Sequence, residues 1–348
     1  MIMDLISKNN SFYIYGAQVV AYGAYKAINH LYNRKPEAFV VSNLTNNPHE
    51  IENIPVETLE KVPQNALIII CVTEVFKNEI AANLTSQGFK NFFHFTYHEE
   101  YLLMSAYFNS IKKFPTVEYK NNNSATDIEI YETKHHKDKK VNNPPTLKIF
   151  EKSVQAGAAL ANIKIANLTD DTEDNISSKN REYCEMTVAY WIWKNSKHDW
   201  KGLEHYRRHL LITLEMLDND IDAILPLPYI CYPNTLAQSR RFISEEILNL
   251  MFETLEKLYS NQYRNYLNIL NDQYQYTYNM VCAKNQVYND YCEWLFNITN
   301  HMESCAERVP NILNARVLGY VSEVLTSLYF MSNQNTLNIK HVEKAIYV

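Results

Sequence analysis

Short apolar runs alternate with helix-like stretches from residue 12 to residue 95, and this alternation constrains the fold more than any other feature. Phe12–Tyr15 is an apolar run that ends at Gly16, and apolar residues then recur at helical spacing as far as Leu31. Further strand candidates occupy residues 38–41, 67–72 and 91–95, and residues 74–87 form a helix candidate. Because parallel strands need such crossovers, we predict an α/β domain with a Rossmann-like parallel sheet and helices on its faces.

The first strand–helix turn departs from the dinucleotide-binding pattern G-x-G-x-x-G. Gly16 holds the first position, but Gln18 holds the second, where its side chain would fill the space of the pyrophosphate. We therefore expect a domain that keeps the tight turn and does not bind NAD tightly. Partner contact, including homo-oligomerisation, is the role we predict for it.

Length and a change of character predict two domains. The 348 residues suit two domains of ordinary size. Residues 112–126 contain a proline and an asparagine run and show no hydrophobic period, as is typical of a linker. We predict a Rossmann-like domain at residues 1–111, a linker at 112–126 and a second α/β domain with long C-terminal helices at 127–348.

The composition argues against several classes of protein. The net charge of −6 argues against a nucleic-acid partner, which needs a basic footprint. Six cysteines without C-x-x-C spacing argue against a disulfide framework and favour a reducing cytoplasm. We expect no signal peptide and no membrane span, because neither apolar pattern is present. The basic cluster at residues 134–140 predicts either a peripheral contact with anionic lipid at the inner face of the membrane or a solvated wall of a ligand site.

Metal use is open at this stage. Residues 170–174 gather carboxylates that suit a hard cation such as Mn²⁺ or Mg²⁺, but an acidic surface loop has the same composition. The run Asp218, Asp220 and Asp222 precedes a strand candidate at 223–227, which is the wrong end of a strand for a ligand site. The sequence contains no P-loop, G-x-S-x-G or H-E-x-x-H motif.

The segment GLEHYRRH at residues 202–209 is the densest group of chemically active residues. A short strand presents His205, Tyr206, Arg207 and Arg208 at its C-terminal end, where open α/β sheets bind ligands. Adjacent guanidinium groups need anions, and their geometry suits a diphosphate, although surface salt bridges are the alternative. Strand alternation would place the two arginines on opposite faces, so that one binds phosphate and the other pairs with a carboxylate such as Glu185.

Several motifs in order resemble those of a bacterial capsular and exopolysaccharide glycosyltransferase family that was formerly known only as a domain of unknown function. The resemblance covers about residues 126–345. It has two departures. Glu173 and Asp171 replace the family's Gly and Asn, and residues 133–136 read Thr-Lys-His-His where the family has Thr-His-Lys at the end of a strand. The matching motifs are QAGAAL (155–160), DDTEDNISSKN (170–180), YCEMT (183–187), YWIWKN (190–195), HYRR (205–208), ILP (224–226), YNM (278–280), YCEWLF (291–296) and GYVSEVL (319–325).

This resemblance implies a GT-A-like fold and a hexosyltransferase. Such an enzyme would move a hexopyranose or hexofuranose from a nucleotide-diphosphate sugar, with a UDP-sugar as the leading candidate, and would invert its configuration. The acceptor would be a capsular, exopolysaccharide or lipopolysaccharide glycan or a lipid-linked oligosaccharide. The alternative is a non-catalytic acceptor-binding or assembly module with a degenerate transferase domain.

The resemblance also assigns roles to residues. It implies Glu323 as general base, with Glu185 as the other candidate, and Arg207, Arg208 and His205 at the leaving diphosphate. Acceptor contacts fall on Tyr278, Asn279 and Met280. Donor contacts fall on Thr133, Lys134, His135, Gln155, Gly157, Asp174, Asn175, Ser177, Asn180, Tyr183, Glu185 and Tyr206.

Overall fold

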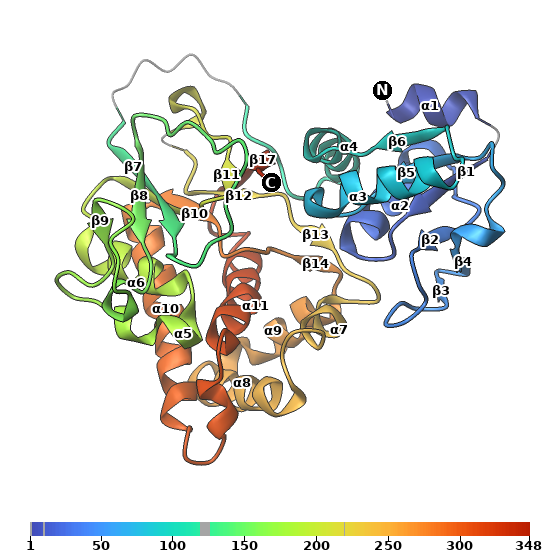
Figure 1. Cartoon of the computed structure of the whole chain (residues 1–348). Helices are drawn as coiled ribbons and strands as arrows, with labels where there is room; N and C mark the ends of the chain where they lie inside the picture. The colour runs from blue at the N-terminus through green and yellow to red at the C-terminus, as the bar shows by residue number, and fades with distance from the viewer. Residues whose placement is uncertain (1, 10, 119–125, 219) are drawn as a thin grey trace. The chain divides into compact units, whose positions relative to one another are not determined.

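The computed structural model describes residues 2–9, 11–118, 126–218 and 220–348 (Figure 1). Residues 119–125 of the predicted linker lie outside the described residues. The chain forms two units: the first contains the residues up to 115 together with 229–233 and 348, and the second contains 116–228 and 234–347. No described helix is long and apolar enough to cross a membrane.

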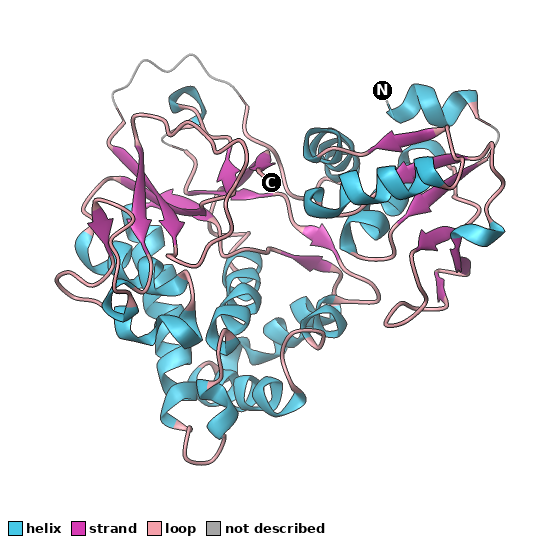
Figure 2. Ribbon diagram, in the orientation of Figure 1, coloured by secondary structure: helices cyan, strands magenta, loops and turns pink. Residues whose placement is uncertain are grey.

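The first unit is built on a six-stranded sheet in the order β3-β4-β2-β1-β5-β6. All pairings are parallel except that of the edge strand β3, which runs antiparallel to β4. The strands are β1 (Phe12–Tyr15), β2 (Phe39–Val41), β3 (Glu50–Ile51), β4 (Ile54–Thr58), β5 (Leu67–Ile70) and β6 (Phe92–His94). The helices are α1 (Ile2–Lys8), α2 (Val19–Tyr32), α3 (Glu74–Ser86) and α4 (Tyr97–Ser110) (Figure 2). The Rossmann-like sheet predicted from the alternating pattern is therefore confirmed.

The turn between β1 and α2 explains why Gly16 is required. Its φ is +120°, and a Cβ at this position would lie 2.5 Å from the carbonyl oxygen of Cys71, at the end of β5. Gln18 occupies the N-cap of α2 and donates its side-chain amide to Asn47 Oδ1 at 3.0 Å. Close packing thus accounts for the glycine without a bound dinucleotide, and weak NAD binding remains a prediction.

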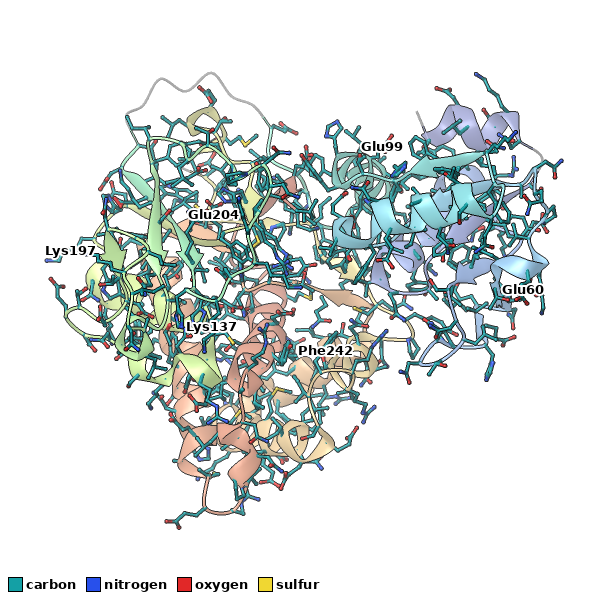
Figure 3. All side chains as sticks on the ribbon, viewed as in Figure 1. Glu60, Glu99, Lys137, Lys197, Glu204 and Phe242 are labelled. Atoms are coloured by element: carbon teal, nitrogen blue, oxygen red, sulfur yellow. The ribbon has the colours of Figure 1, made fainter. Side chains whose placement is uncertain are left out.

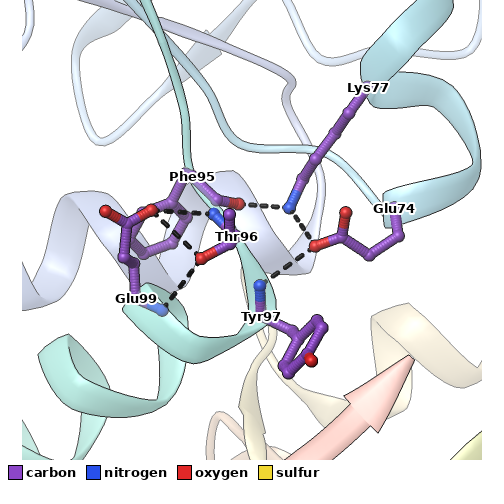
Figure 4. A network of polar contacts seen from close by, with 6 residues as sticks. All are labelled: Glu74, Lys77, Phe95, Thr96, Tyr97 and Glu99. Atoms are coloured by element: carbon purple, nitrogen blue, oxygen red, sulfur yellow. Dashed lines mark hydrogen bonds and ion pairs between the residues drawn. The ribbon is translucent and has the colours of Figure 1, made fainter. Parts of the chain in front are cut away.

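A polar network joins the start of α3 to the start of α4 (Figure 4). The buried ammonium of Lys77 contacts Glu74 at 2.6 Å and also donates to the carbonyl oxygen of Phe95. Glu74 Oε1 accepts the backbone N–H of Tyr97 at 3.0 Å. Thr96 and Glu99 form a capping box, which satisfies two of the free N–H groups at the start of α4. The network stabilises the edge of the sheet beside β6.

The second unit is built on a nine-stranded mixed sheet whose main path is β16-β12-β15-β10-β7-β8-β9. β10, β7, β8 and β9 run parallel, and β15 runs antiparallel to both β10 and β12. The strands are β7 (Ile128–Lys134), β8 (Glu151–Gln155), β9 (Leu168–Thr169), β10 (Trp200–His205), β11 (Arg208–Leu210), β12 (Ala223–Pro226), β15 (Val281–Lys284), β16 (Ile339–Val342) and β17 (Lys344–Ile346). Two further short strands lie outside this sheet, β13 (Tyr229–Ile230), which falls within the first unit, and β14 (Tyr274–Gln275).

Helices of the second unit gather on one side of this sheet, where α6 and α10 pack on β10 (Figure 1). They are α5 (Asn180–Tyr183), α6 (Met186–Asn195), α7 (Thr235–Ser239), α8 (Glu245–Leu258), α9 (Ser260–Asn271), α10 (Asn285–Ser304) and α11 (Val317–Ser332). The predicted α/β class with long C-terminal helices is confirmed. An apolar core of buried residues that includes Ile130, Leu210, Ile224 and Met280 holds the sheet together.

The residue patterns also predict a helix at residues 155–160, a helix from Asn180 to Trp193 and a strand at residues 278–283, and these three predictions were wrong. Residues 155–160 do not form a helix: Gln155 ends β8, and Gly157 at φ 63° leads into a 3-10 turn. The helix expected from Asn180 to Trp193 breaks at Cys184, whose φ of 52° is incompatible with a helix. Strand β15 starts at Val281, because residues 278 and 279 form a turn. Helix α9 was not predicted.

Candidate active site

Several residues predicted to bind the donor come from the C-terminal ends of adjacent parallel strands. Thr133 of β7 is the register partner of His205 of β10, and Lys134 of β7 is the partner of Gln155 of β8. The same edge therefore carries the ends of three strands and the loops that follow them. Open α/β sheets bind ligands at this edge.

Strand β10 reverses direction at the HYRR segment. His205 pairs with Arg208 across an antiparallel hairpin, and Tyr206 and Arg207 form its turn. The expectation that a continuing strand places Arg207 with His205 and Arg208 on the opposite face is therefore wrong. Directly paired residues share one face of a sheet, so Arg208 is the arginine that accompanies His205.

Both arginines are half-buried, and neither forms an ion pair with a carboxylate in the described part of the chain. Arg208 Cζ lies 4.1 Å from the centre of the Tyr278 ring, and Arg207 Cζ lies 5.6 Å from that of Tyr206. The Nε atoms of both guanidinium groups are buried and lack a hydrogen-bond acceptor among the described residues. A buried charge without a partner is costly, so this pair is suited to an anionic ligand.

Glu323 lies close enough to Arg208 and to Glu185 for the charges of both residues to act on it. Burial, together with the neighbouring charge of Glu185, raises the pKa of Glu323 to about 8. The backbone N–H of Tyr278 and the charges of Arg208 and Arg316 act in the opposite direction. A carboxyl group with a pKa near neutral pH can exchange a proton with a reacting hydroxyl, which is what a general base requires.

Asn279 holds Glu185 in place. Its amide donates to Glu185 Oε1 at 2.8 Å and to the carbonyl oxygen of Gly319 at 3.3 Å, and its Oδ1 accepts from Thr326 at 3.2 Å. Glu185 forms no ion pair with either arginine among the described residues, so the expected Glu185–arginine pair is wrong. Asn279 is buried and occupied, which makes it a positioning residue.

A strained turn presents this asparagine. Tyr278 and Asn279 have φ values of 71° and 52°, which are uncommon for residues other than glycine. Consecutive strained residues persist only where the surroundings fix them, and they are frequent at functional sites. The turn also directs the Tyr278 ring to Arg208 and its carbonyl oxygen to His205.

His205 is a neutral imidazole near physiological pH. Burial lowers its pKa, and Arg208 and Arg207 lower it further, whereas Glu185 raises it. Its Nε2 lies 2.5 Å from the carbonyl oxygen of Tyr278, so Nε2 carries the hydrogen and Nδ1 carries the lone pair.

A buried carboxylate that the sequence did not single out organises the donor-side loop. Asp170 is fully buried and accepts four hydrogen bonds, from the N–H groups of Gly157 and Ala158 and from the hydroxyls of Ser177 and Thr187, at 2.5–2.9 Å. Asn180 donates to Thr187 Oγ1 at 3.0 Å, and a Cβ on Gly157 would lie 2.7 Å from the Asn180 side chain. The side chains of Ser177 and Asn180 thus build the loop through contacts within the protein.

Other predicted site residues are also occupied by contacts within the chain. Gln155 is buried and binds the backbone of residues 163 and 165. Asp174 accepts from the Tyr190 hydroxyl, and the Tyr183 hydroxyl donates to Glu303. Asn175 donates to the carbonyl oxygen of Glu173 and accepts from the N–H of Ser177. Met280 belongs to the apolar core.

The strand end at residues 133–135 contributes polar groups to the same edge. Lys134 forms an ion pair with Glu132 at 2.8 Å. The backbone N–H of His135 donates to Asp138 at 2.7 Å, and burial lowers the pKa of the His135 imidazole. Lys137, labelled in Figure 3, is exposed in the loop that follows.

Three buried side chains form a group that could hold a metal ion. The ligand atoms of Glu151, Glu204 and His209 lie within 4.8 Å of one another, and Figure 3 labels Glu204. Lys148 already pairs with Glu151 at 2.9 Å. His209 contacts Glu204 at 3.0 Å and Glu132 at 3.5 Å, and these carboxylates raise its pKa to about 9. A protonated imidazole cannot ligate a metal, so the group fits a charge-balanced network better than a cation site.

Two comparisons with known proteins found matches. A solved structure described as "WbbM bifunctional glycosytransferase apo structure" matches with a TM-score of 0.54 and 26% sequence identity over 64% of this chain. The match spans 45% of that protein, less than half of its length. No curated protein matches. Residues 129–334, more than half of the chain, match the family described as "Domain of unknown function (DUF4422)", and the chain belongs to this family.

Proposed function

We propose that the chain is a glycosyltransferase that moves a hexose from a nucleotide-diphosphate sugar, with a UDP-sugar as the first candidate, to a glycan or lipid-linked acceptor. Similarity to a solved glycosyltransferase supports the reaction class. The observation that carries the proposal is the pair of half-buried arginines without an anionic partner among the described residues, at a ligand-binding sheet edge. A donor diphosphate supplies the missing negative charge.

The chemistry follows from the positions of these groups. The acceptor oxygen attacks the anomeric carbon, the bond from that carbon to the diphosphate oxygen breaks, and the diphosphate leaves with the electron pair. Arg208 and Arg207 stabilise the growing charge, an effect larger in the transition state than in the ground state. Glu323 accepts the hydroxyl proton, so a single displacement inverts the configuration. His205 orients the turn at Tyr278 and supports the donor side.

Donor recognition is assigned to the loops at the same edge. Thr133, Lys134, His135 and Tyr206 face the donor directly in this proposal. Gln155, Gly157, Ser177 and Asn180 shape the donor loop through Asp170. Tyr278 bounds the acceptor side. Mn²⁺ or Mg²⁺ would assist by neutralising the diphosphate, and the proposal holds with or without such an ion.

The two predicted domains receive different roles in this proposal. We assign residues 1–111 to partner contact or self-association and residues 127–348 to catalysis. In this proposal the glycosyl transfer takes place in the cytoplasm at the inner face of the membrane. The exposed side chains of Lys137, Lys139 and Lys140 contact anionic lipid there. Flotation with anionic liposomes tests this, and unchanged flotation after neutralising the three lysines would remove the membrane role.

The first experiment is a thermal-shift screen against nucleotides and nucleotide sugars, with and without Mn²⁺. The best ligand is then tested for hydrolysis without acceptor. We expect stabilisation by a nucleoside diphosphate and slow hydrolysis of its sugar. Binding of glycans with no binding or hydrolysis of any nucleotide sugar would instead support the non-catalytic module.

A further inference from the structure

A pocket of about 550 Å³ lies on the second unit and shares no residue with the candidate active site. It is formed where α6, α10 and the junction of α8 and α9 meet (Figure 1). We propose that this pocket binds a neutral oligosaccharide. That the bound glycan is the acceptor chain rests on the proposed function; the binding itself does not. The lining residues are Trp193, Tyr259, Asp290, Glu293, Trp294, Phe296, Asn297 and Asn300.

The aromatic rings of the pocket are held by their neighbours. Trp193 is parallel to Phe296 at 5.7 Å, and Lys194 Nζ lies 3.4 Å from its ring centre. Trp294 contacts Tyr259 at 5.8 Å. Lys194 covers one face of Trp193 and Phe296 is buried, so the ring surface open to a ligand comes from Tyr259, Trp294 and the rest of Trp193. Rings that are already fixed lose little side-chain entropy when a ligand binds. The C–H face of a sugar ring is apolar and packs well on such a surface.

Polar side chains follow one face of α10 beside these rings. Asp290, Glu293, Asn297 and Asn300 are exposed at helical spacing, and they cover about 15 Å of helix length at ~1.5 Å per residue. Glu293 and Asn300 form no hydrogen bond with other residues of the described chain. Their oxygen and nitrogen atoms are free to bind sugar hydroxyls along an extended ligand.

The charge of the pocket lining favours a neutral sugar. Neither Asp290 nor Glu293 forms an ion pair in the part of the chain that the structure describes. The lining contains two carboxylates and no lysine or arginine, and these charges outnumber the one ammonium, Lys194, that lies against the Trp193 ring. Phosphates, nucleotides and uronic acids are therefore disfavoured here. The volume falls in the range of small-ligand sites and exceeds what one ring fills. A short neutral glycan satisfies the rings, the hydroxyl-binding groups and the charge together.

The test is a titration of the full chain with maltohexaose, cellohexaose and chitohexaose, followed by tryptophan fluorescence. We expect saturable binding of at least one of them in the millimolar range. Glu293→Ala and Asn300→Ala should each weaken it about 2- to 10-fold, the value of one hydrogen bond. Glu256→Ala, an exposed carboxylate of α8 outside the pocket, is the matched control and should bind as the wild type does.

Three outcomes would overturn the proposal: no saturable binding of any of the three oligosaccharides, equal affinity in both pocket variants and the wild type, or saturation by choline alone. The last would identify an aromatic cage for ammonium ions. If the glycan is the acceptor, Glu293→Ala raises the KM for a glycan acceptor and leaves acceptor-free donor hydrolysis unchanged. Oligosaccharide binding without any transferase activity would refute the proposed function but would still support oligosaccharide binding by this pocket.

Discussion

Replacing Glu323 by Gln should change how stability depends on pH. The folded carboxyl group keeps its proton up to a pKa of about 8, whereas the unfolded group loses it near the ordinary value of 4.5. Between these values the unfolded state binds one proton fewer than the folded state. The free energy of unfolding therefore falls by about 1.4 kcal/mol for each pH unit in this window.

Glutamine imitates the protonated acid and removes this dependence. The contribution of Glu323 is fully present below pH 4.5 and is lost as the pH rises toward 8. Relative to the wild type, Glu323→Gln should gain about 3 kcal/mol in unfolding free energy between pH 5 and pH 7, from two units of that slope. Titrating groups that do not interact with Glu323, such as Glu204 and His209, contribute equally to both proteins and cancel in the difference.

Urea denaturation followed by tryptophan fluorescence measures this difference. All four tryptophans, Trp191, Trp193, Trp200 and Trp294, lie in the second unit and report on its unfolding. Glu307→Gln, an exposed carboxylate, is the matched control and should run parallel to the wild type. If the difference between Glu323→Gln and the wild type is the same at pH 5 and pH 7, the buried-acid argument is refuted.

The same variant tests the chemistry. Wild-type turnover should rise with pH toward 8 as Glu323 loses its proton, and Glu323→Gln should lose ~10²-fold or more. Glu185→Gln removes a neighbouring negative charge and should move the midpoint of the wild-type profile to lower pH. Turnover of Glu323→Gln equal to the wild type would transfer the base role to Glu185 or to an aspartate of residues 170–174.

Three further predictions follow from the contacts. Arg208→Ala should lower turnover ~10²–10³-fold with little change in melting temperature, since the guanidinium has no protein anion among the described residues; a large loss of stability with normal turnover would contradict this. Asp170→Asn should destabilise the second unit by several kcal/mol, because four buried donors lose a charged acceptor; a melting curve like that of the wild type would refute the loop assignment. Calorimetry of the full chain with NAD should show no micromolar binding, and Gln18→Gly should not create it, because Gly16 is explained by packing against Cys71.

The sheet of the first unit was predictable because its strands are fully apolar and its turns carry their own signals. Strand β5 reads LIII and is buried throughout, and Gly88 follows α3 with a φ of 89°. Helix α9 could also have been predicted from the sequence. Tyr263, Tyr266 and Leu270 recur at helical spacing, but the segment is polar overall and follows α8 after one residue.

The hairpin at residues 205–208 could not be predicted from the sequence. Two-residue hairpins are usually marked by Asn-Gly, Asp-Gly or Gly-Gly, and here the turn residues are Tyr206 and Arg207. Nothing local distinguishes this turn from a continued strand. The pairing that sets the turn comes from β17, where Arg208 is the partner of Ile346. A contact over more than 130 residues of sequence leaves no local pattern.

The role of Asp170 was hidden for a related reason. An acidic run shows which residues are charged, but burial decides which one organises the loop, and the donors to Asp170 come from residues 157, 158, 177 and 187. Its neighbour Asp171 is exposed in the same run. The motif QAGAAL and the motif DDTEDNISSKN are therefore two halves of one structural unit.

Hydrogen-bond satisfaction divides the predicted site residues into two groups. Ser177, Asn180 and Asn279 have their polar groups engaged by the protein, so a ligand would have to replace contacts of similar strength. Arg207 and Arg208 have buried Nε atoms without acceptors among the described residues, so an anion adds contacts and removes an existing cost. Substitutions in the first group should therefore lower stability before they lower turnover. Those in the second should lower turnover with little change in the melting temperature of the ligand-free protein.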